Sequence, residues 1–222
     1  MNNLLFFITV IVTFSSLVFV SRKFGKEGIF AWIGLSVVLA NIFVCKCVDL
    51  FGLSATLGNV LFGSVFLATD ILTENYGVQV AKKAVWVGVC AEVISIMLTQ
   101  IALLFTPNAL DVVQGSFSNI FGLFPRTSIA SISMFILSNN LDIYLFEKLR
   151  NRTNGKYLWL RNNIATCTSQ CIENYLFYII AFFGLYSMQD ILVMTLICCI
   201  IEIIVALCDT PFIYLAVNKV KE

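Results

Sequence analysis

The chain of 222 residues contains no histidine, and only 12% of its residues are charged. Soluble domains carry about 25% charged residues, so this composition excludes an ordinary soluble protein. Without histidine, the side chain that usually transfers protons near neutral pH is missing, and any proton relay has to use carboxyl groups. The sequence also lacks the G-x-x-x-x-G-K-S/T phosphate loop, so we expect no ATPase activity of its own.

The sequence has eight cysteines but no C-x-x-C pair, and there is no histidine to complete a zinc ligand set. The cysteines lie in or beside apolar segments, which favours a role in packing. We therefore expect no metal and no cofactor. The net charge of +1 also argues against a nucleic-acid partner.

What the sequence does contain is long apolar runs: 59% of the residues are hydrophobic, and the mean hydropathy is +0.93. The runs do not alternate in polarity, which indicates helices and not barrel strands. We predict an all-α polytopic membrane protein, a six- to seven-helix bundle forming one domain over residues 1–222, with the lipid bilayer around it. The apolar stretches are 3–21, 28–48, 57–73, 83–105, 127–147, 162–184 and 189–216.

Basic residues lie in every second connector. The first, third and fifth connectors and the tail carry lysine or arginine, whereas Asp111 and Asp190 lie in the fourth and sixth. By the positive-inside rule, this pattern places the N-terminus outside and the C-terminus in the cytoplasm. The third stretch, 57–73, is short and contains Gly58, Gly63 and Asp70, so a broken or re-entrant helix is the alternative to a full span there.

The first polar cluster lies at the end of the third stretch. Asp70 and Glu74 are four residues apart and share one helical face. A carboxylate at bilayer depth costs roughly 2.5–3.5 kcal/mol on insertion scales, which points to a polar site. For Glu74 the alternative is a solvated ion pair with Lys82 or Lys83 at the helix end.

A second polar cluster opens the sixth stretch. Asn163, Gln170 and Asn174 fall on one stripe of a helix, with Glu173 beside it. Such groups cannot face lipid, so they face protein or water. They supply both donors and acceptors, which suits a heterocycle that carries an amide and an exocyclic amine. The alternatives are hydrogen bonds between helices and, for Arg161, a cytoplasmic anchor.

The two clusters, in this order, resemble the queuosine precursor transporter family, which is also described as a vitamin uptake transporter family. The similarity covers about residues 35–210. The segments that carry it are Leu39-Ala-Asn-Ile-Phe43, Thr69-Asp-Ile-Leu-Thr-Glu-Asn-Tyr-Gly77, Asp142-Ile-Tyr-Leu-Phe146, Trp159-Leu-Arg-Asn-Asn163 and Thr168-Ser-Gln170. This chain has Glu173 where the family commonly has aspartate.

The resemblance implies an importer of 7-deazaguanine compounds for tRNA modification, not an enzyme. It also implies a fold like that of the substrate-binding subunits of energy-coupling-factor transporters. We hypothesise that Asp70 or Glu173 binds the guanine-like edge of the substrate, and that amide side chains support it. The predicted substrate-binding residues are Asn41, Asp70, Glu74, Asn163, Gln170, Glu173 and Asn174.

Other functions stay open at this point. One is a substrate-binding subunit for another vitamin-like compound that needs a separate ATPase partner. Another is an intramembrane enzyme or a scaffold, although the absence of histidine removes several protease types. The sequence does not decide between proton coupling and facilitated diffusion, and it leaves a homo-oligomer open.

Overall fold

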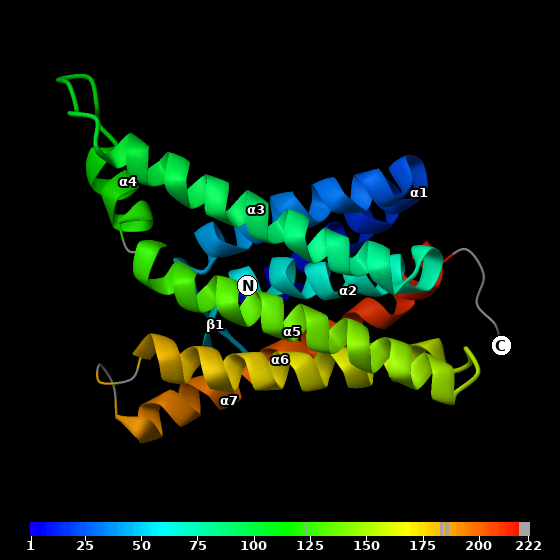
Figure 1. Cartoon of the computed structure of the whole chain (residues 1–222). Helices are drawn as coiled ribbons and strands as arrows, with labels where there is room; N and C mark the ends of the chain where they lie inside the picture. Colours follow the sequence, from blue (N-terminus) through cyan, green and yellow to red (C-terminus); the bar gives the residue numbers. More distant parts are fainter. Residues whose placement is uncertain (123, 183, 185–186, 218–222) are drawn as a thin grey trace.

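The computed structural model describes residues 1–122, 124–182, 184 and 187–217 (Figure 1). These residues form a helical bundle with one small antiparallel hairpin, which confirms the predicted all-α class. The elements are α1 (Asn2–Phe43), β1 (Cys47–Leu50), β2 (Leu53–Thr56), α2 (Gly58–Tyr76), α3 (Val78–Leu103), α4 (Gln114–Phe121), α5 (Phe124–Arg152), α6 (Leu158–Phe182) and α7 (Met188–Ala216).

Helix α1 contains two of the predicted stretches, because the chain reverses direction within it at Gly25. This residue has φ 61° and ψ −145°, a conformation outside the helical region. A straight helix of 42 residues would be about 63 Å long. Instead, Asn2 donates to the carbonyl of Asp49 in the hairpin, and Arg22 donates to the carbonyl of Leu215 at the far end of α7. The two halves of α1 are therefore separate membrane-length segments.

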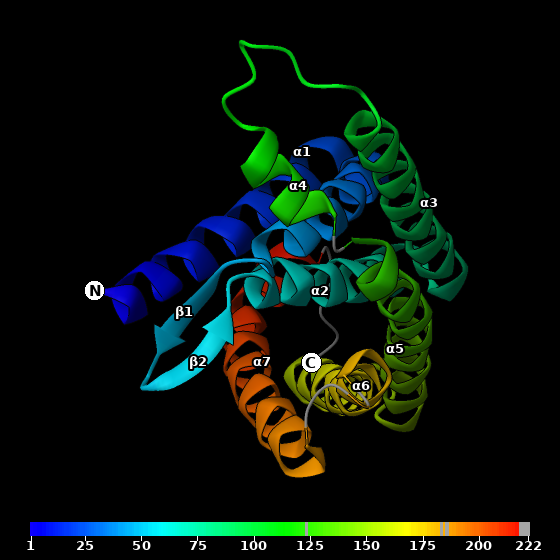
Figure 2. The ribbon, with the colours of Figure 1, turned by 90° about the vertical axis from the view of Figure 1, so that its left-hand side faces the viewer.

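Helix α2 lies at the centre of the bundle, with α1, α3, α5, α6 and α7 around it (Figure 2). It is an unbroken helix from Gly58 to Tyr76, so the broken-helix alternative is wrong. Its glycines allow close packing. A Cβ at Gly63 would lie 2.7 Å from Val205 Cγ1 on α7, and one at Gly58 would lie 2.7 Å from the Ala40 carbonyl on α1. Small residues let the backbones approach, as in other membrane helices.

The second predicted stretch, 28–48, extends too far, because the helix ends at Phe43 and the chain then forms the β1–β2 hairpin. The turn of the hairpin is formed by Phe51 (φ 54°) and Gly52 (φ 80°), the two positive φ values of a type I′ turn. The backbone N–H of Phe51 donates to Asn3 Oδ1. The hairpin thus closes the end of the bundle that holds the N-terminus.

The basic connectors meet at the opposite end. Arg22 and Asn75 donate to the Leu215 and Ala216 carbonyls, and the Trp159 N–H donates to the Tyr214 hydroxyl. The first, third and fifth connectors and the end of α7 therefore share one face, as the charge pattern predicts. Lys219 and Lys221 of the predicted basic tail lie outside the described residues.

Three described helices, α1, α3 and α7, are long and apolar enough to cross a membrane by length and composition alone. Their outer surfaces carry large exposed apolar side chains, among them Phe19, Leu98 and Leu196. Helices α2, α5 and α6 hold most of the buried polar residues. Apolar helices therefore supply much of the surface for lipid, and more polar helices build the interior.

The turn at Gly25 yields the first prediction. Because this backbone conformation is essentially restricted to glycine, Gly25→Ala should reduce the free energy of unfolding by about 1–3 kcal/mol. Unfolding of the purified protein by SDS titration measures the change. Gly115→Ala is the control, because Gly115 has no positive φ and its Cβ would meet no atom within 4 Å. Equal stability of the two variants would contradict the strained turn.

Candidate functional site

Buried polar side chains gather where α2 faces α5, α6 and α7. Each of them is at most 9% exposed, although the helices that carry them are membrane-length. The buried acidic residues are Asp70, Glu92, Asp142, Glu173, Glu202 and Asp209, and the amides and hydroxyls near them include Ser138, Asn139, Asn162, Thr166, Ser169, Gln170 and Asn174. Polar groups without water are costly, so this interior is a candidate binding site.

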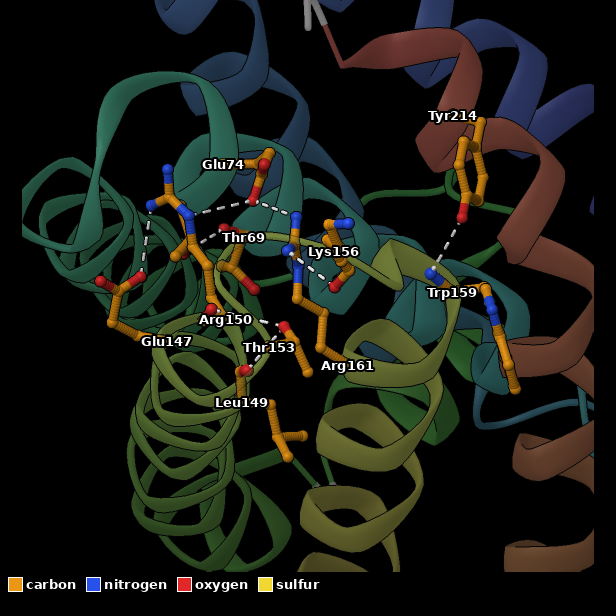
Figure 3. Close-up of polar contacts among 11 residues, drawn as sticks. Thr69, Glu74, Glu147, Leu149, Arg150, Thr153, Lys156, Trp159, Arg161 and Tyr214 are labelled. Carbon is orange, nitrogen blue, oxygen red and sulfur yellow. Dashed lines mark hydrogen bonds and ion pairs between the residues drawn. The ribbon is translucent and has the colours of Figure 1, made fainter. Parts of the chain in front are cut away.

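An ion pair lies at the basic end of this interior. Arg161 Nη2 of α6 is 2.6 Å from Glu74 Oε2 of α2, and both side chains are buried (Figure 3). The guanidinium carbon of Arg161 lies 5.1 Å from the centre of the Phe146 ring on α5, which adds a cation–π contact. Arg150 Nε approaches the same Glu74 oxygen at 3.5 Å. The pair joins three helices at one point.

These contacts decide between two interpretations of the sequence. The solvated pair of Glu74 with Lys82 or Lys83 is wrong, because the Glu74 side chain is only 7% exposed and its partners are Arg161 and Arg150. The anchor interpretation of Arg161 is also wrong, since its side chain is 1% exposed. Sequence spacing could not identify these partners, because they come from helices far away along the chain.

Most of the buried carboxyl groups accept a hydrogen bond from a neighbouring helix. The pairs are Asn41 Nδ2 with Glu92 Oε1 (2.9 Å), Thr166 Oγ1 with Asp142 Oδ1 (3.2 Å), Asn162 Nδ2 with Asp209 Oδ1 (2.7 Å), Asn174 Nδ2 with Glu202 Oε2, and Ser138 with Glu173. Each acid is thereby partly satisfied inside the bundle.

Asp70 differs from these acids. It is fully buried, and neither of its oxygens accepts a hydrogen bond from a donor among the described residues. The polar group that it contacts is the carboxyl group of Asp142, which can donate only when protonated. Asp209 and Arg161 are also close enough to act on it electrostatically. Apart from this carboxyl group, no donor among the described residues reaches the two oxygens of Asp70.

Gln170 also has open hydrogen-bonding capacity. Its side chain is 2% exposed, and both its oxygen and its nitrogen lack a partner among the described residues. It faces α2, because a Cβ at Gly63 would lie 4.0 Å from its Nε2. One oxygen of Glu173 and the hydroxyl of Ser169 also lack a partner in the described part of the chain. Together with Asp70, these groups offer acceptors and donors to a polar ligand.

The remaining predicted residues contact neighbouring helices. Asn163 donates to the Trp159 carbonyl and to Thr210 Oγ1 of α7. Asn174 is bonded to Glu202, and Asn41 is bonded to Glu92. Their placement agrees with the alternative of hydrogen bonds between helices, although contact with a substrate stays a prediction for each of them.

Sequence reasoning did not include Asn162, Asp142 or Asp209 among the candidate site residues, yet all three lie beside Asp70 or its neighbours. A signal was available for Asn162, because it directly follows Arg161 in the Trp-Leu-Arg-Asn-Asn segment. Asp142 follows Ser138, Asn139 and Asn140 on α5, and Asp209 lies in the apolar helix α7, but periodicity alone does not say which helix faces either aspartate. Among the described residues, no group of three or more histidine, cysteine or acidic side chains is placed to hold a metal ion.

The model of the family described as "Putative vitamin uptake transporter" matches residues 56–216. A "Probable queuosine precursor transporter" of Bacillus subtilis (strain 168) is 38% identical over 216 residues, which cover 97% of this chain and 94% of that protein. No solved structure matches the chain, so the predicted likeness to energy-coupling-factor subunits stays a prediction.

Two more distant relatives match parts of the chain. A "Probable queuosine precursor transporter" of Haemophilus influenzae is 28% identical over 60% of this chain and 54% of its own length. The "Queuosine precursor transporter" of Escherichia coli (strain K12) is 26% identical over 67% of this chain and 64% of its own length. The relatives are transporters and not enzymes, and the apolar helices make this a multi-pass membrane protein. By the family match and the near full-length similarity, the chain belongs to the vitamin uptake transporter family.

Proposed function

We propose that this protein imports a queuosine precursor across the cytoplasmic membrane for use in tRNA modification. The substrate class is a 7-deazaguanine: 7-cyano-7-deazaguanine, 7-aminomethyl-7-deazaguanine, queuine or queuosine. The names of the relatives support this class. The observation that carries the proposal is the buried carboxyl group of Asp70, whose two oxygens have no donor among the described residues other than the carboxyl group of Asp142.

A deazaguanine supplies the donors that Asp70 lacks. Its N1–H and its 2-amino group lie side by side on one edge, so one carboxylate can accept both in a bidentate pair. The amide of Gln170 can donate to the O6 carbonyl on the same edge of the ring, and both its polar atoms are unpartnered. A site of this kind rejects analogues without the polar edge, because its own buried groups would then stay unpaired.

The other predicted residues take two roles in this proposal. Glu173 keeps one unpartnered oxygen and is a further ligand for the substrate. Glu74, Asn41, Asn163 and Asn174 hold helices in place, since each has its own partner on a neighbouring helix. Their removal should disturb the site through its geometry and not through direct contact.

The basic end of the bundle is the cytoplasmic end in this proposal. The first, third and fifth connectors lie there together with the end of α7, and lysine and arginine are retained on the cytoplasmic side of membrane proteins. The pair of Arg161 and Glu74 then lies between the polar interior and the cytoplasm. Its separation would open a route from Asp70 to the cytoplasm.

The function is tested in cells that cannot synthesise the queuosine base. Cells with the gene, fed one precursor at nanomolar concentration, should recover queuosine in their tRNA, and cells without it should not. Mass spectrometry of digested tRNA gives the queuosine content. If no precursor restores queuosine although the protein is present in the membrane, the proposed substrate class is wrong. Another vitamin-like compound is then the expected substrate.

In the same cells, Asp70→Asn and Gln170→Ala should each lower the initial rate at which the fed precursor appears as queuosine in tRNA about 10- to 100-fold, the effect of losing a hydrogen bond to a charged or buried group. Glu27→Gln is the matched control, because the Glu27 side chain is 74% exposed and has only a long contact of 3.9 Å with Lys26. Protein in the membrane is quantified for each variant. Normal uptake by both site variants would refute this site.

The ion pair predicts a graded loss of stability. Arg161→Gln leaves Glu74 buried without its closest partner and should cost about 3–5 kcal/mol. Arg150→Gln removes a longer and more exposed contact and should cost less than about 1 kcal/mol. The double variant Glu74→Gln/Arg161→Gln should regain part of the loss, since no buried charge stays unpaired. SDS unfolding titrations measure all three, and equal losses for the two arginine variants would contradict the assignment.

The orientation predicts the behaviour of fusions at the C-terminus. A green fluorescent protein fused there should fluoresce, and an alkaline phosphatase fused at the same point should be inactive, because only the first matures in the cytoplasm. Fusions in the connector after α3, near Asp111, should behave in the opposite way. Active phosphatase at the C-terminus would invert the proposed topology.

A further inference from the structure

A pocket of about 500 Å³ lies between α3 and α5, away from the polar interior. It is lined by Lys82 and Val78 near the start of α3 and by Tyr144, Lys148 and Arg152 in the second half of α5. The side chains of Asp142 and Phe146, in the same part of α5, are fully buried, whereas Tyr144 and Lys148 are exposed. The pocket therefore opens on the outer surface of the bundle and not into the candidate transport site.

The charges in the pocket are predominantly positive. Lys82, Lys148 and Arg152 are exposed cations from two helices. The acid beside them, Glu147, has its Oε2 3.4 Å from Nη1 of Arg150, so part of its charge is balanced by that arginine. Three cations converging on a concave surface indicate an anionic ligand with several acceptor oxygens, such as a phosphate ester.

Aromatic and apolar groups continue from the cations into the membrane. Tyr144 lies one helical turn deeper than Lys148, and Trp86 lies one turn deeper than Lys82. Both rings are more than half exposed. Tryptophan and tyrosine at this depth are typical of the membrane interface. Beyond Trp86, the exposed side of α3 is apolar, with Ile94 and Leu98 exposed by 51% and 61%.

We propose that this pocket binds the headgroup of an anionic phospholipid from the cytoplasmic leaflet, with the acyl chains along the exposed side of α3. Basic pockets between membrane helices on the cytoplasmic side suit such headgroups, and each lysine or arginine near the surface contributes to the attraction. Free phosphate shares the charge but has no chain to lie against Trp86 and Tyr144. A phospholipid therefore matches both the basic pocket and the aromatic and apolar surface beside it.

Native mass spectrometry of the full-length protein in detergent tests the proposal. Phosphatidylglycerol and phosphatidylcholine with identical acyl chains are added at equal concentration, and the bound lipid per protein is counted. Phosphatidylglycerol should remain bound, and Lys82→Gln/Lys148→Gln should lower its apparent affinity about tenfold or more. Lys83→Gln/Lys156→Gln is the matched control, because it removes the same charge from exposed lysines at the same end of the bundle outside the pocket.

Three results would overturn the proposal: equal binding of both lipids, equal loss of binding in both double variants, or displacement of phosphatidylglycerol by millimolar inorganic phosphate. The first would remove the selectivity for anionic lipids. The second would assign the binding to general surface charge, and the third would make the pocket a site for a free anion. All four lysines are exposed, and thermal unfolding of each variant verifies that it is folded.

Discussion

The ion pair between Glu74 and Arg161 is the contact on which the arrangement of the interior depends. It ties the central helix α2 to α6, and Phe146 brings α5 against the same guanidinium. A buried arginine cannot lose its proton, so it requires an anion at close range. Two of the segments that carry the family resemblance, around Glu74 and around Arg161, thus meet through this pair.

The pair also sets the charge balance around Asp70. Glu74 and Arg161 largely neutralise each other, so the remaining buried acids have to be satisfied by hydrogen bonds. Amides and hydroxyls do this for Glu92, Asp142, Glu202 and Asp209, each with a donor from a different helix. Asp70 differs from these four acids, because the only donor that the described part of the chain offers it is another carboxyl group, that of Asp142. In the proposed function, a neutral ligand rich in N–H groups would complete the network without adding charge.

Much of the bundle could be predicted from the sequence, because apolar length and connector charge are local properties. The seven stretches correspond to the two halves of α1 and to α2, α3, α5, α6 and α7. The hairpin after Phe43 was missed, since its strands are short and continue an apolar run. The glycines of α2 were interpreted as possible breaks, although they are needed for close packing. The sequence does not show this, because the residues that they pack against, Ala40 and Val205, are distant along the chain.

For the candidate site, the sequence indicated which residues are polar at depth but not which of them have partners. Helical spacing places Asp70 and Glu74 on one face, yet their surroundings differ: Glu74 is held in an ion pair, and Asp70 has no donor among the described residues other than the Asp142 carboxyl group. The same holds for Gln170 and Asn174, which lie one turn apart on α6, with only the second bonded to another helix. Glu74 and Asn174 thus have partners on neighbouring helices, whereas Asp70 and Gln170 keep polar atoms that lack an amide, hydroxyl or basic partner among the described residues. In the proposed function, this division separates residues that hold the helices together from residues that bind the substrate.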